Sequence, residues 1–277
     1  MPLTLDKLIG AYKQRIPLIK TNSITTVAGL PFTLIDRAGF PVAGSLNPSS
    51  VVNGAVPTDA TAGFPTIEDP TGSNKLYLSR VAINASVAMS VELFDVLFWA
   101  GQTTIPTSGT TTVALTSRPS FTTRVPFLVD GTTRDWTQVQ LFIQLSVAGS
   151  NHAHTTSIDY LDQGGAAGNT GNQSTQNIAV NRLIRCPLAA GDTGVQELTG
   201  YNVNGIASAA GAVSALAMRS LGKFRTQGGL STLYGPDYTG LPEIFGASAL
   251  LAVAYTDSTS SGVPSVDLEI AHMDPAA

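Results

Sequence analysis

The strongest constraint on the fold is a stretch, RVAINASVAMSVELF, in which every second residue is apolar. The apolar positions are Val81, Ile83, Ala85, Val87, Met89, Val91 and Leu93. Successive side chains of a β-strand point to opposite faces, so this pattern predicts one long, half-buried strand over residues 80–94. One face of that strand must pack against other apolar side chains.

Two further stretches show the same alternation. WTQVQLFIQLSVAG predicts a strand over residues 136–147, and SVDLEIAH predicts another over residues 265–272. Their inward positions are Val139, Leu141, Ile143, Leu145, Val147, Val266, Leu268 and Ile270. Weaker strand signals recur along the chain and are separated by Gly, Pro and Asn, without helical stretches between them. The sequence therefore predicts an all-β fold, an antiparallel β-sandwich or jelly roll.

The first 20 residues have a different period. Apolar residues fall at helical spacing until Pro17, at positions Leu5, Leu8, Ile9, Tyr12 and Ile16. Thr4 is a suitable N-cap. These residues predict a short N-terminal amphipathic helix that is followed by an extended segment. A helix of this length is marginal in water, so its apolar face must dock on the same chain or on another one.

The N-terminal segment is also basic. Its charged residues are Lys7, Lys13, Arg15 and Lys20 against one acid, Asp6, whereas the rest of the chain holds more acids than bases. We therefore expect residues 1–20 to form a docking arm that contacts an acidic surface on a neighbouring copy or on the assembly to which the chain binds. The expected contact residues are Leu5, Leu8, Ile9, Tyr12, Ile16, Lys13 and Arg15. The alternatives are a helix that packs on its own sandwich and a solvated helix face.

Two segments are too polar and too rich in turn-forming residues to belong to the core. Residues 40–74 contain several prolines, and residues 164–177 read GGAAGNTGNQSTQN. Loops of this length are uncommon in compact domains unless they have a function or lie along a partner. Residues 21–277 are predicted to form one β-sandwich domain that carries both loops. A division into two β halves at residues 164–177 is the alternative.

Composition narrows the class of function. Charged residues are only 12% of the chain, about half of the ~25% that is usual in soluble domains. A surface with few charges resists association less than a charged one, which favours a chain that works within an assembly. The net charge of −4 argues against specific or general nucleic-acid binding. The N-terminal residues lack the apolar core of a signal peptide, and no apolar run is long enough for a membrane span, so we expect no membrane contact.

The best candidate for chemistry is the stretch NHAHTTSIDYLD, where His152 and His154 precede Asp159 and Asp162. Two histidines at positions i and i+2 of a strand share a face and could chelate a metal. Because no third ligand lies at a motif spacing, we expect a hydrogen-bonded turn or strand start instead. The single cysteine, Cys186, lies in the apolar run LIRCPL and is predicted to be buried. Hydrolase, nucleotide-binding and zinc-protease motifs are absent from the sequence, so we expect no enzyme, no cofactor and no metal.

Several stretches resemble segments of the virion structural proteins of tailed bacteriophages. They are TTVAGLPFTLIDRAGFPVAGSL, VPTDATAGFPTI, VELFDVLFWAGQ and RCPLAAGDTGVQELTGYNV. The resemblance implies a β-sandwich or jelly-roll subunit that coats or binds a capsid lattice, or that forms part of a tail.

From this resemblance we expect a non-enzymatic capsid decoration or cement protein of the virion, made in the cytoplasm of a bacterial host. Its expected partners are the major capsid protein and other copies of itself, as trimers that fit the threefold joints of a lattice. One alternative is a tail, neck, baseplate or fibre-base subunit. A second alternative, from a different class, is a carbohydrate-binding β-sandwich.

Overall fold

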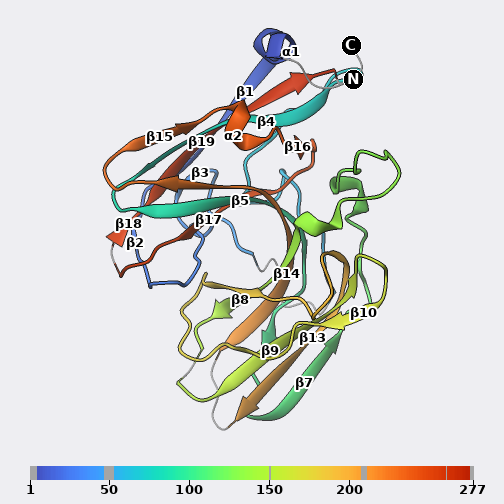
Figure 1. Ribbon diagram of the computed structural model, residues 1–277. Helices are drawn as coiled ribbons and strands as arrows, with labels where there is room; N and C mark the ends of the chain where they lie inside the picture. Colours follow the sequence, from blue (N-terminus) through green and yellow to red (C-terminus); the bar gives the residue numbers. More distant parts are fainter. Residues whose placement is uncertain (1–4, 47–52, 150, 207–210, 260, 275–277) are drawn as a thin grey trace.

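The computed structural model describes residues 5–46, 53–149, 151–206, 211–259 and 261–274. Three antiparallel sheets and a two-stranded ribbon make up nearly all of its regular structure (Figure 1). The two α-helices of this part of the chain, α1 (Leu5–Gly10) and α2 (Pro236–Thr239), are short. The predicted all-β class with antiparallel strands is confirmed.

The sheet drawn at the top of Figure 1 is called the upper sheet. Its strand order is β15-β4-β19-β1-β3, and β16 also pairs with β4. Its strands are β1 (Tyr12–Lys20), β3 (Gly39–Phe40), β4 (Lys75–Ala85), β15 (Ser231–Tyr234), β16 (Glu243–Ile244) and β19 (Pro264–Met273). The ribbon of β2 (Ile24–Thr25) and β18 (Ser261–Gly262) lies at one side of this sheet (Figure 1).

The central sheet has the order β12-β8-β14-β5-β17, and β6 also pairs with β14. Its strands are β5 (Met89–Trp99), β6 (Thr103–Thr104), β8 (Val139–Val147), β12 (Leu183–Cys186), β14 (Ala212–Thr226) and β17 (Leu250–Tyr255). Two short 3-10 helices, η1 (Thr122–Arg124) and η2 (Trp136–Gln138), precede β8.

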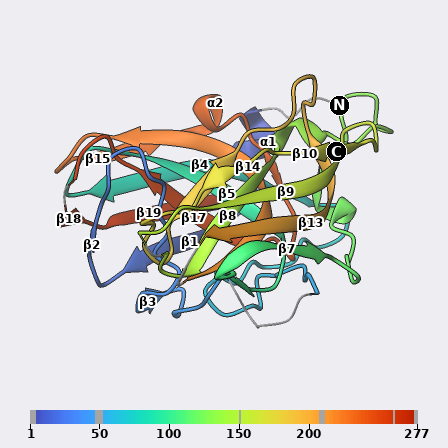
Figure 2. The ribbon, with the colours of Figure 1, turned by 90° about the horizontal axis from the view of Figure 1, so that it is seen from below.

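The lower sheet has the order β10-β9-β13-β7, and β11 also pairs with β9. Its strands are β7 (Ser108–Ala114), β9 (His154–Asp162), β10 (Ala167–Asn169), β11 (Gln173–Ser174) and β13 (Val195–Ile206). Seen from below, β7, β13 and β9 lie side by side (Figure 2).

The long strands β5 and β14 take part in two apolar cores. Leu93 of β5 and Leu221 of β14 belong to the core beneath the upper sheet. Leu97 of β5 and Ala217 of β14 belong to the core above the lower sheet. The β5–β14 register shifts on both sides of Arg219, which lies between these two sets. The chain therefore forms two β-sandwiches that have the central sheet in common.

A third apolar cluster covers other side chains of the same two strands. Phe94 and Trp99 of β5 and Leu216 of β14 pack there with Leu46 and Phe64. These last two residues come from the segment in which a long loop is expected. Its described residues, 41–46 and 53–74, form no helix or strand beyond a single bridge at Ala55. The segment thus contributes buried side chains although it has no regular structure of its own.

The prediction of one strand over residues 80–94 is wrong, because β4 ends at Ala85 and β5 begins at Met89. The two strands lie in different sheets and face one core between them. All seven alternating residues, from Val81 to Leu93, border that core. Every second residue is apolar both before and after the turn between β4 and β5. The sequence therefore predicted correctly which side chains face the core, but it did not predict the turn.

The other two strand predictions are confirmed with small changes at their ends. Residues 136–147 correspond to η2 and β8, and residues 265–272 lie within β19. The expectation of a loop over residues 164–177 is wrong in part, because β10 and β11 within it pair with β9. Short strands of small and polar residues on a sheet edge give no apolar alternation to detect.

The predicted helix over the N-terminal segment is also wrong in extent. Helix α1 ends at Gly10, and the chain continues as β1, which pairs with β19 from Tyr12 to Leu18 and with β3 at Ile19 and Lys20. A spacing of four residues is a multiple of two, so Tyr12 and Ile16 fit a strand as well as a helix. Glycine at position 10 disfavours further helix, and pairing with β19 decides the outcome.

The seven expected docking residues do not share one face. Ile16 is 2% exposed in the upper core, and Leu8 is buried in a small cluster with Tyr77. Ile9 and Tyr12 are exposed, and Arg15 pairs with Asp267 on the surface. Lys13 is partly exposed on β1, and Leu5 begins α1. Residues 12–20 are thus a strand of the subunit's own sheet, and the contact role of this segment stays a prediction.

This placement can be tested within the segment. We expect Ile16→Ala to lower the free energy of unfolding by about 2–5 kcal/mol, because it opens a cavity in the upper core. The matched control, Ile9→Ala at an exposed position of α1, should change it by no more than ~0.5 kcal/mol. Chemical denaturation followed by circular dichroism measures both. If both variants change the free energy of unfolding by the same small amount, β1 does not stabilise the fold, and the docking-arm interpretation is favoured.

Candidate functional site

One carboxylate, that of Asp95, is completely buried in the middle of the molecule. It lies in β5 within the apolar run VELFDVLFWA, directly opposite Arg219 of β14 and Leu250 of β17 in the strand register. A buried charge is stable only with partners that neutralise it and satisfy its hydrogen bonds.

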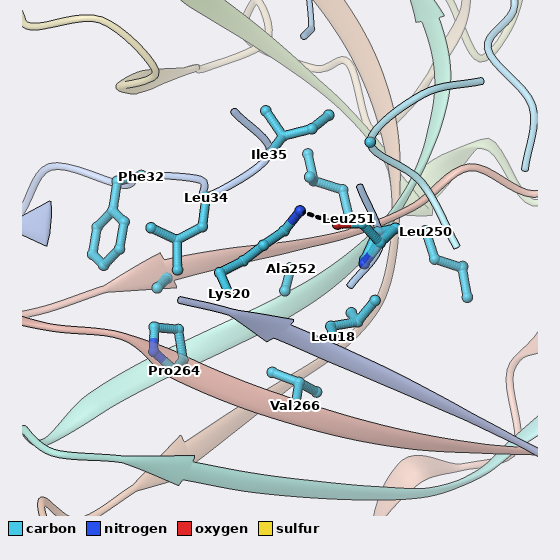
Figure 3. Close-up of a pocket in the computed structure, with 13 residues that line it drawn as sticks. Leu18, Lys20, Phe32, Leu34, Ile35, Leu250, Leu251, Ala252, Pro264 and Val266 are labelled. Carbon is cyan, nitrogen blue, oxygen red and sulfur yellow. Dashed lines mark hydrogen bonds between the residues drawn. The ribbon is translucent and has the colours of Figure 1, made fainter. Parts of the chain in front are cut away.

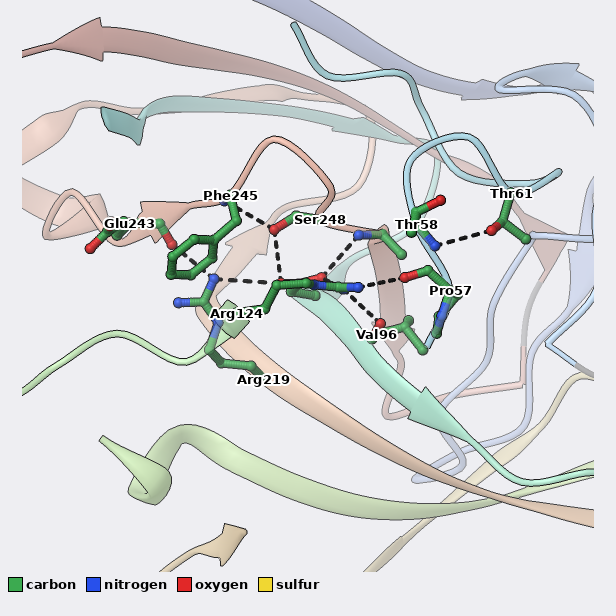
Figure 4. Close-up of polar contacts among 11 residues, drawn as sticks. Pro57, Thr58, Thr61, Val96, Arg124, Arg219, Glu243, Phe245 and Ser248 are labelled. Atoms are coloured by element: carbon green, nitrogen blue, oxygen red, sulfur yellow. Dashed lines mark hydrogen bonds and ion pairs between the residues drawn. The ribbon is translucent and has the colours of Figure 1, made fainter. Parts of the chain in front are cut away.

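Several groups donate to Asp95 or pair with it, and Arg124, Arg219 and Ser248 among them are labelled in Figure 4. Arg124 donates through Nε, at 3.2 Å, and through Nη2 to the two carboxylate oxygens. Ser248 Oγ and the backbone N–H of Ala249 donate at 2.8 and 2.9 Å. Nη2 of Arg219 lies 3.6 Å from Oδ2. The carboxylate is therefore paired with groups from three separate segments of the chain.

The two arginines extend this cluster to the surrounding backbone. Arg124, at the end of η1, also donates to the carbonyl oxygens of Pro57 and Val96. Arg219 Nη2 donates to the carbonyl of Glu243 at 2.8 Å. Burial lowers the pKa of Arg219, and the charge of Asp95 opposes that effect.

The cluster is built for structure and not for catalysis. Asp95 and Arg219 are 0% exposed and Arg124 is 3% exposed, so no substrate reaches the three charges. Their bonds join β5 and β14 to η1 and to the long loop at Pro57. They lie between the residues that enter the upper core and those that enter the lower core. The cluster thus fixes the junction between the two sandwiches.

A small apolar cavity opens beside β1, β17 and β19 in the upper sandwich (Figure 3). Its volume is about 40 Å³. The lining is almost wholly aliphatic or aromatic and includes Leu18, Phe32, Leu34, Ala252 and Val266. A cavity of this size admits roughly three groups as large as a water molecule.

Among the described residues that line this cavity, Lys20 alone is charged. Its ammonium group donates to the carbonyl oxygens of Pro41 at 2.6 Å and Arg37 at 3.2 Å. Figure 3 shows the Lys20 side chain among the other lining residues. Burial lowers the pKa of Lys20, and the nearby charge of Asp36 raises it in part. An ammonium group has three donors, so one remains for a further acceptor.

A second, more polar hollow of about 770 Å³ lies at the edge of the upper sandwich. Arg225, Gln227, Thr232, Tyr255 and Asp257 are among its lining residues. Its breadth and mixed polarity do not define a site for one small ligand.

The segment PFLVDGTTR, residues 126–134, exposes three consecutive apolar side chains and is called the apolar loop. Phe127 and Leu128 are about half exposed, and Val129 is 107% exposed. In Figure 1 this loop projects from the right side of the molecule, in green. Isolated apolar residues on a surface are normal, but three in a row at a loop tip indicate a contact surface.

The apolar loop is held in one conformation by its own hydrogen bonds. Leu128 N–H donates to the carbonyl of Thr133 at 2.8 Å, and Gly131, with φ of +68°, donates to that of Leu128 at 2.9 Å. The Asp130 carboxylate accepts from the backbone N–H groups of Thr132 and Thr133 at 2.8 Å each. These bonds leave Val129 at the apex, free of contacts that would bury it.

A cation–π contact supports the base of the loop. The guanidinium carbon of Arg134 lies 3.7 Å from the centre of the Phe127 ring, and Arg134 Nη1 donates to the carbonyl of Val125 at 2.6 Å. A loop that is ordered before binding loses less entropy when it docks.

The histidine and aspartate residues of NHAHTTSIDYLD are not brought together. His152 is exposed, whereas His154 is buried at the start of β9 with Nδ1 2.5 Å from Thr175 Oγ1. Asp159 bonds with Asn169 and Asn202, and Asp162 accepts from backbone N–H groups in the turn after β9. Within the described part of the chain, no group of three or more His, Cys, Asp or Glu residues could hold a metal.

Cys186 is buried as predicted, and burial raises the pKa of its thiol to about 12.

Among the described residues, no helix is long and apolar enough to span a bilayer.

No family model matches the chain, and neither does any curated protein. Three solved structures of infectious bursal disease virus align with 95% of this chain and 81% of their own. The VP2 subviral particle is 10% identical with a TM-score of 0.20, the Gx strain 9% with 0.21, and the Gt strain 11% with 0.18. TM-scores this low carry no argument about fold or function.

The charge cluster yields a prediction about stability. Asp95→Asn should lower the free energy of unfolding by about 3–5 kcal/mol, because it leaves two buried arginines without their counter-charge. The control is Asp267→Asn, which removes the surface pair with Arg15 and should cost no more than ~1 kcal/mol. Denaturant unfolding measures both variants. If the two effects are equal, Asp95 does not secure the junction.

The thiol of Cys186 gives a second test. In the native protein at about pH 8 it should stay protonated and should not react with a disulfide reagent, whereas the ordinary pKa of a cysteine would allow reaction. The same protein unfolded in denaturant should react stoichiometrically, which is the control. Rapid reaction of the native protein would contradict the burial of Cys186.

Proposed function

We propose that this chain is a non-enzymatic structural subunit of a virion, whose task is to bind other copies of itself and the capsid. The observation that carries the proposal is the apolar loop, which is closed by its own backbone hydrogen bonds and exposes Phe127, Leu128 and Val129. Enzymes need reactive groups that a substrate can reach, and the strongest charge cluster here is closed to solvent. A contact surface without an accessible reactive centre fits assembly.

Within this role, we favour a capsid decoration or cement protein of a tailed bacteriophage. The sequence stretches that resemble phage virion proteins support this choice, and so does the low content of charged residues. Each copy would span a joint between capsid subunits, and trimers would fit threefold joints. Repetition over a shell strengthens contacts that are individually weak. The major capsid protein would be the principal partner.

A tail, neck, baseplate or fibre-base subunit remains the alternative within the virion. Both roles use the same kind of contact surface, so the number of copies per particle separates them. A shell protein is present in hundreds of copies, and a tail component in far fewer.

A carbohydrate-binding sandwich is the alternative from another class, and one observation bears on it. A row of polar side chains crosses the lower sheet, where Thr112 bonds with Asn202, and Asn202 and Asn169 bond with Asp159. Such a row could bind sugar hydroxyls. Both tryptophans, Trp99 and Trp136, are buried, so neither offers the stacking platform that sugar binding favours.

Purified particles of the virus that encodes the chain test the proposal. Quantitative mass spectrometry should find hundreds of copies per particle, and immunogold labelling should decorate the whole shell. Labelling confined to the tail would select the alternative. Absence from the particle would overturn the virion role, and a glycan array would then test the polar row of the lower sheet.

A further inference from the structure

The apolar loop and the Lys20 cavity are complementary in size. Val129 presents an isopropyl group of three carbon atoms at the loop apex, and it is the most exposed large apolar side chain described. The cavity of about 40 Å³ has room for roughly three groups as large as a water molecule and has an almost wholly apolar lining. An apolar knob in a pocket that excludes water is the usual centre of a protein interface.

Their charges are complementary as well. Asp130 follows Val129, and its carboxylate is fixed beside the apex by Thr132 and Thr133. Hydrogen bonds from the side chain and the backbone N–H of Thr133, and from the backbone of Thr132, lower the pKa of Asp130 to about 2, so the group is charged at any ordinary pH. Lys20 lies in the cavity lining with one ammonium donor unused. The carboxylate beside Val129, which we call the knob, thus matches the ammonium group in the lining of the Lys20 cavity, which we call the socket.

We propose that the apolar loop of one copy of this chain docks into the Lys20 cavity of a second copy. Val129 enters the cavity, and Asp130 pairs with Lys20 at its rim. The inference deepens the proposed assembly role and rests on it for the choice of a second copy as the occupant.

One chain cannot make this contact with itself. The cavity is lined in part by β17, and both views place the green apolar loop apart from that strand (Figures 1 and 2). Each copy therefore offers one knob and one socket on different parts of its surface. Such a contact is heterologous, so repeated docking gives a ring or an open array and not an isolated twofold dimer.

Two variants of the full chain test the two sides of the contact separately. Val129→Asp places a charge on the knob at a fully exposed position, so the fold should survive. Ala252→Leu adds three carbon atoms to the cavity lining and fills the socket. Each variant should weaken self-association by about 10- to 100-fold in sedimentation velocity, as loss of a central contact does. Val180→Asp, at an exposed valine outside the loop, is the matched control and should associate like the wild type.

The decisive measurement is a mixture of the two variants. Val129→Asp retains its socket and Ala252→Leu retains its knob, so an equimolar mixture should form a one-to-one dimer that grows no further. Native mass spectrometry distinguishes the two chains by mass. Lys20→Gln, which keeps a side chain of similar length without the charge, should weaken association by about tenfold. Melting curves show that every variant is folded.

Several results would overturn the inference. The first is a wild-type chain that stays monomeric at about 1 mM, a concentration at which a contact of millimolar strength is half formed. The second is a folded Val129→Asp protein that associates as the wild type does. The third is a mixture of the two folded variants that gives no dimer. If Val129→Asp enters virus particles as well as the wild type does, the docking contact fails and the virion role stands. If the wild type neither associates nor occurs in particles, both fail.

Discussion

The carboxylate of Asp95 is the group on which the arrangement of the two sandwiches depends. It lies in the central sheet between two apolar cores, and it is neutralised by Arg124 from η1 and Arg219 from the neighbouring strand. Buried ion pairs add little net stability compared with apolar packing, but each partner is costly to remove once the others are present. The cluster therefore serves mainly to fix how β5, β14 and η1 are aligned, because any other alignment would leave a charge unpaired in the interior.

Much of the fold could be predicted from the sequence because burial follows the strand period. The alternation from Val81 to Leu93 identified the correct inward face even though it crosses from one sheet to another. It could not reveal the turn, since a chain that passes between two facing sheets can keep its phase. The N-terminal segment misled for a related reason: Tyr12 and Ile16 satisfy both periods, and only the long-range pairing with β19 distinguishes them.

The candidate contact residues were harder to predict than the core. The run Phe127-Leu128-Val129 before Asp130-Gly131 reads as a short buried strand and a turn, and nothing local says that all three side chains face solvent. The two acids in the apolar run VELFDVLFWA, Glu92 and Asp95, do signal buried charges, but the partners of Asp95 lie far away in sequence, at Arg124 and Arg219. Lys20 was noted only as part of a basic segment, because its cavity is assembled from several distant segments.

The shared central sheet has a thermodynamic consequence for the molecule. Strands β5 and β14 contribute to the cores on both sides, so loss of either outer sheet would expose apolar side chains of the same two strands to water. The free energies of the two halves are coupled in this way, and neither half carries a complete set of strands from which it could be cut out as an independent module. Upper and lower sheets are held in a fixed relative orientation by two strands of the central sheet that pack against both.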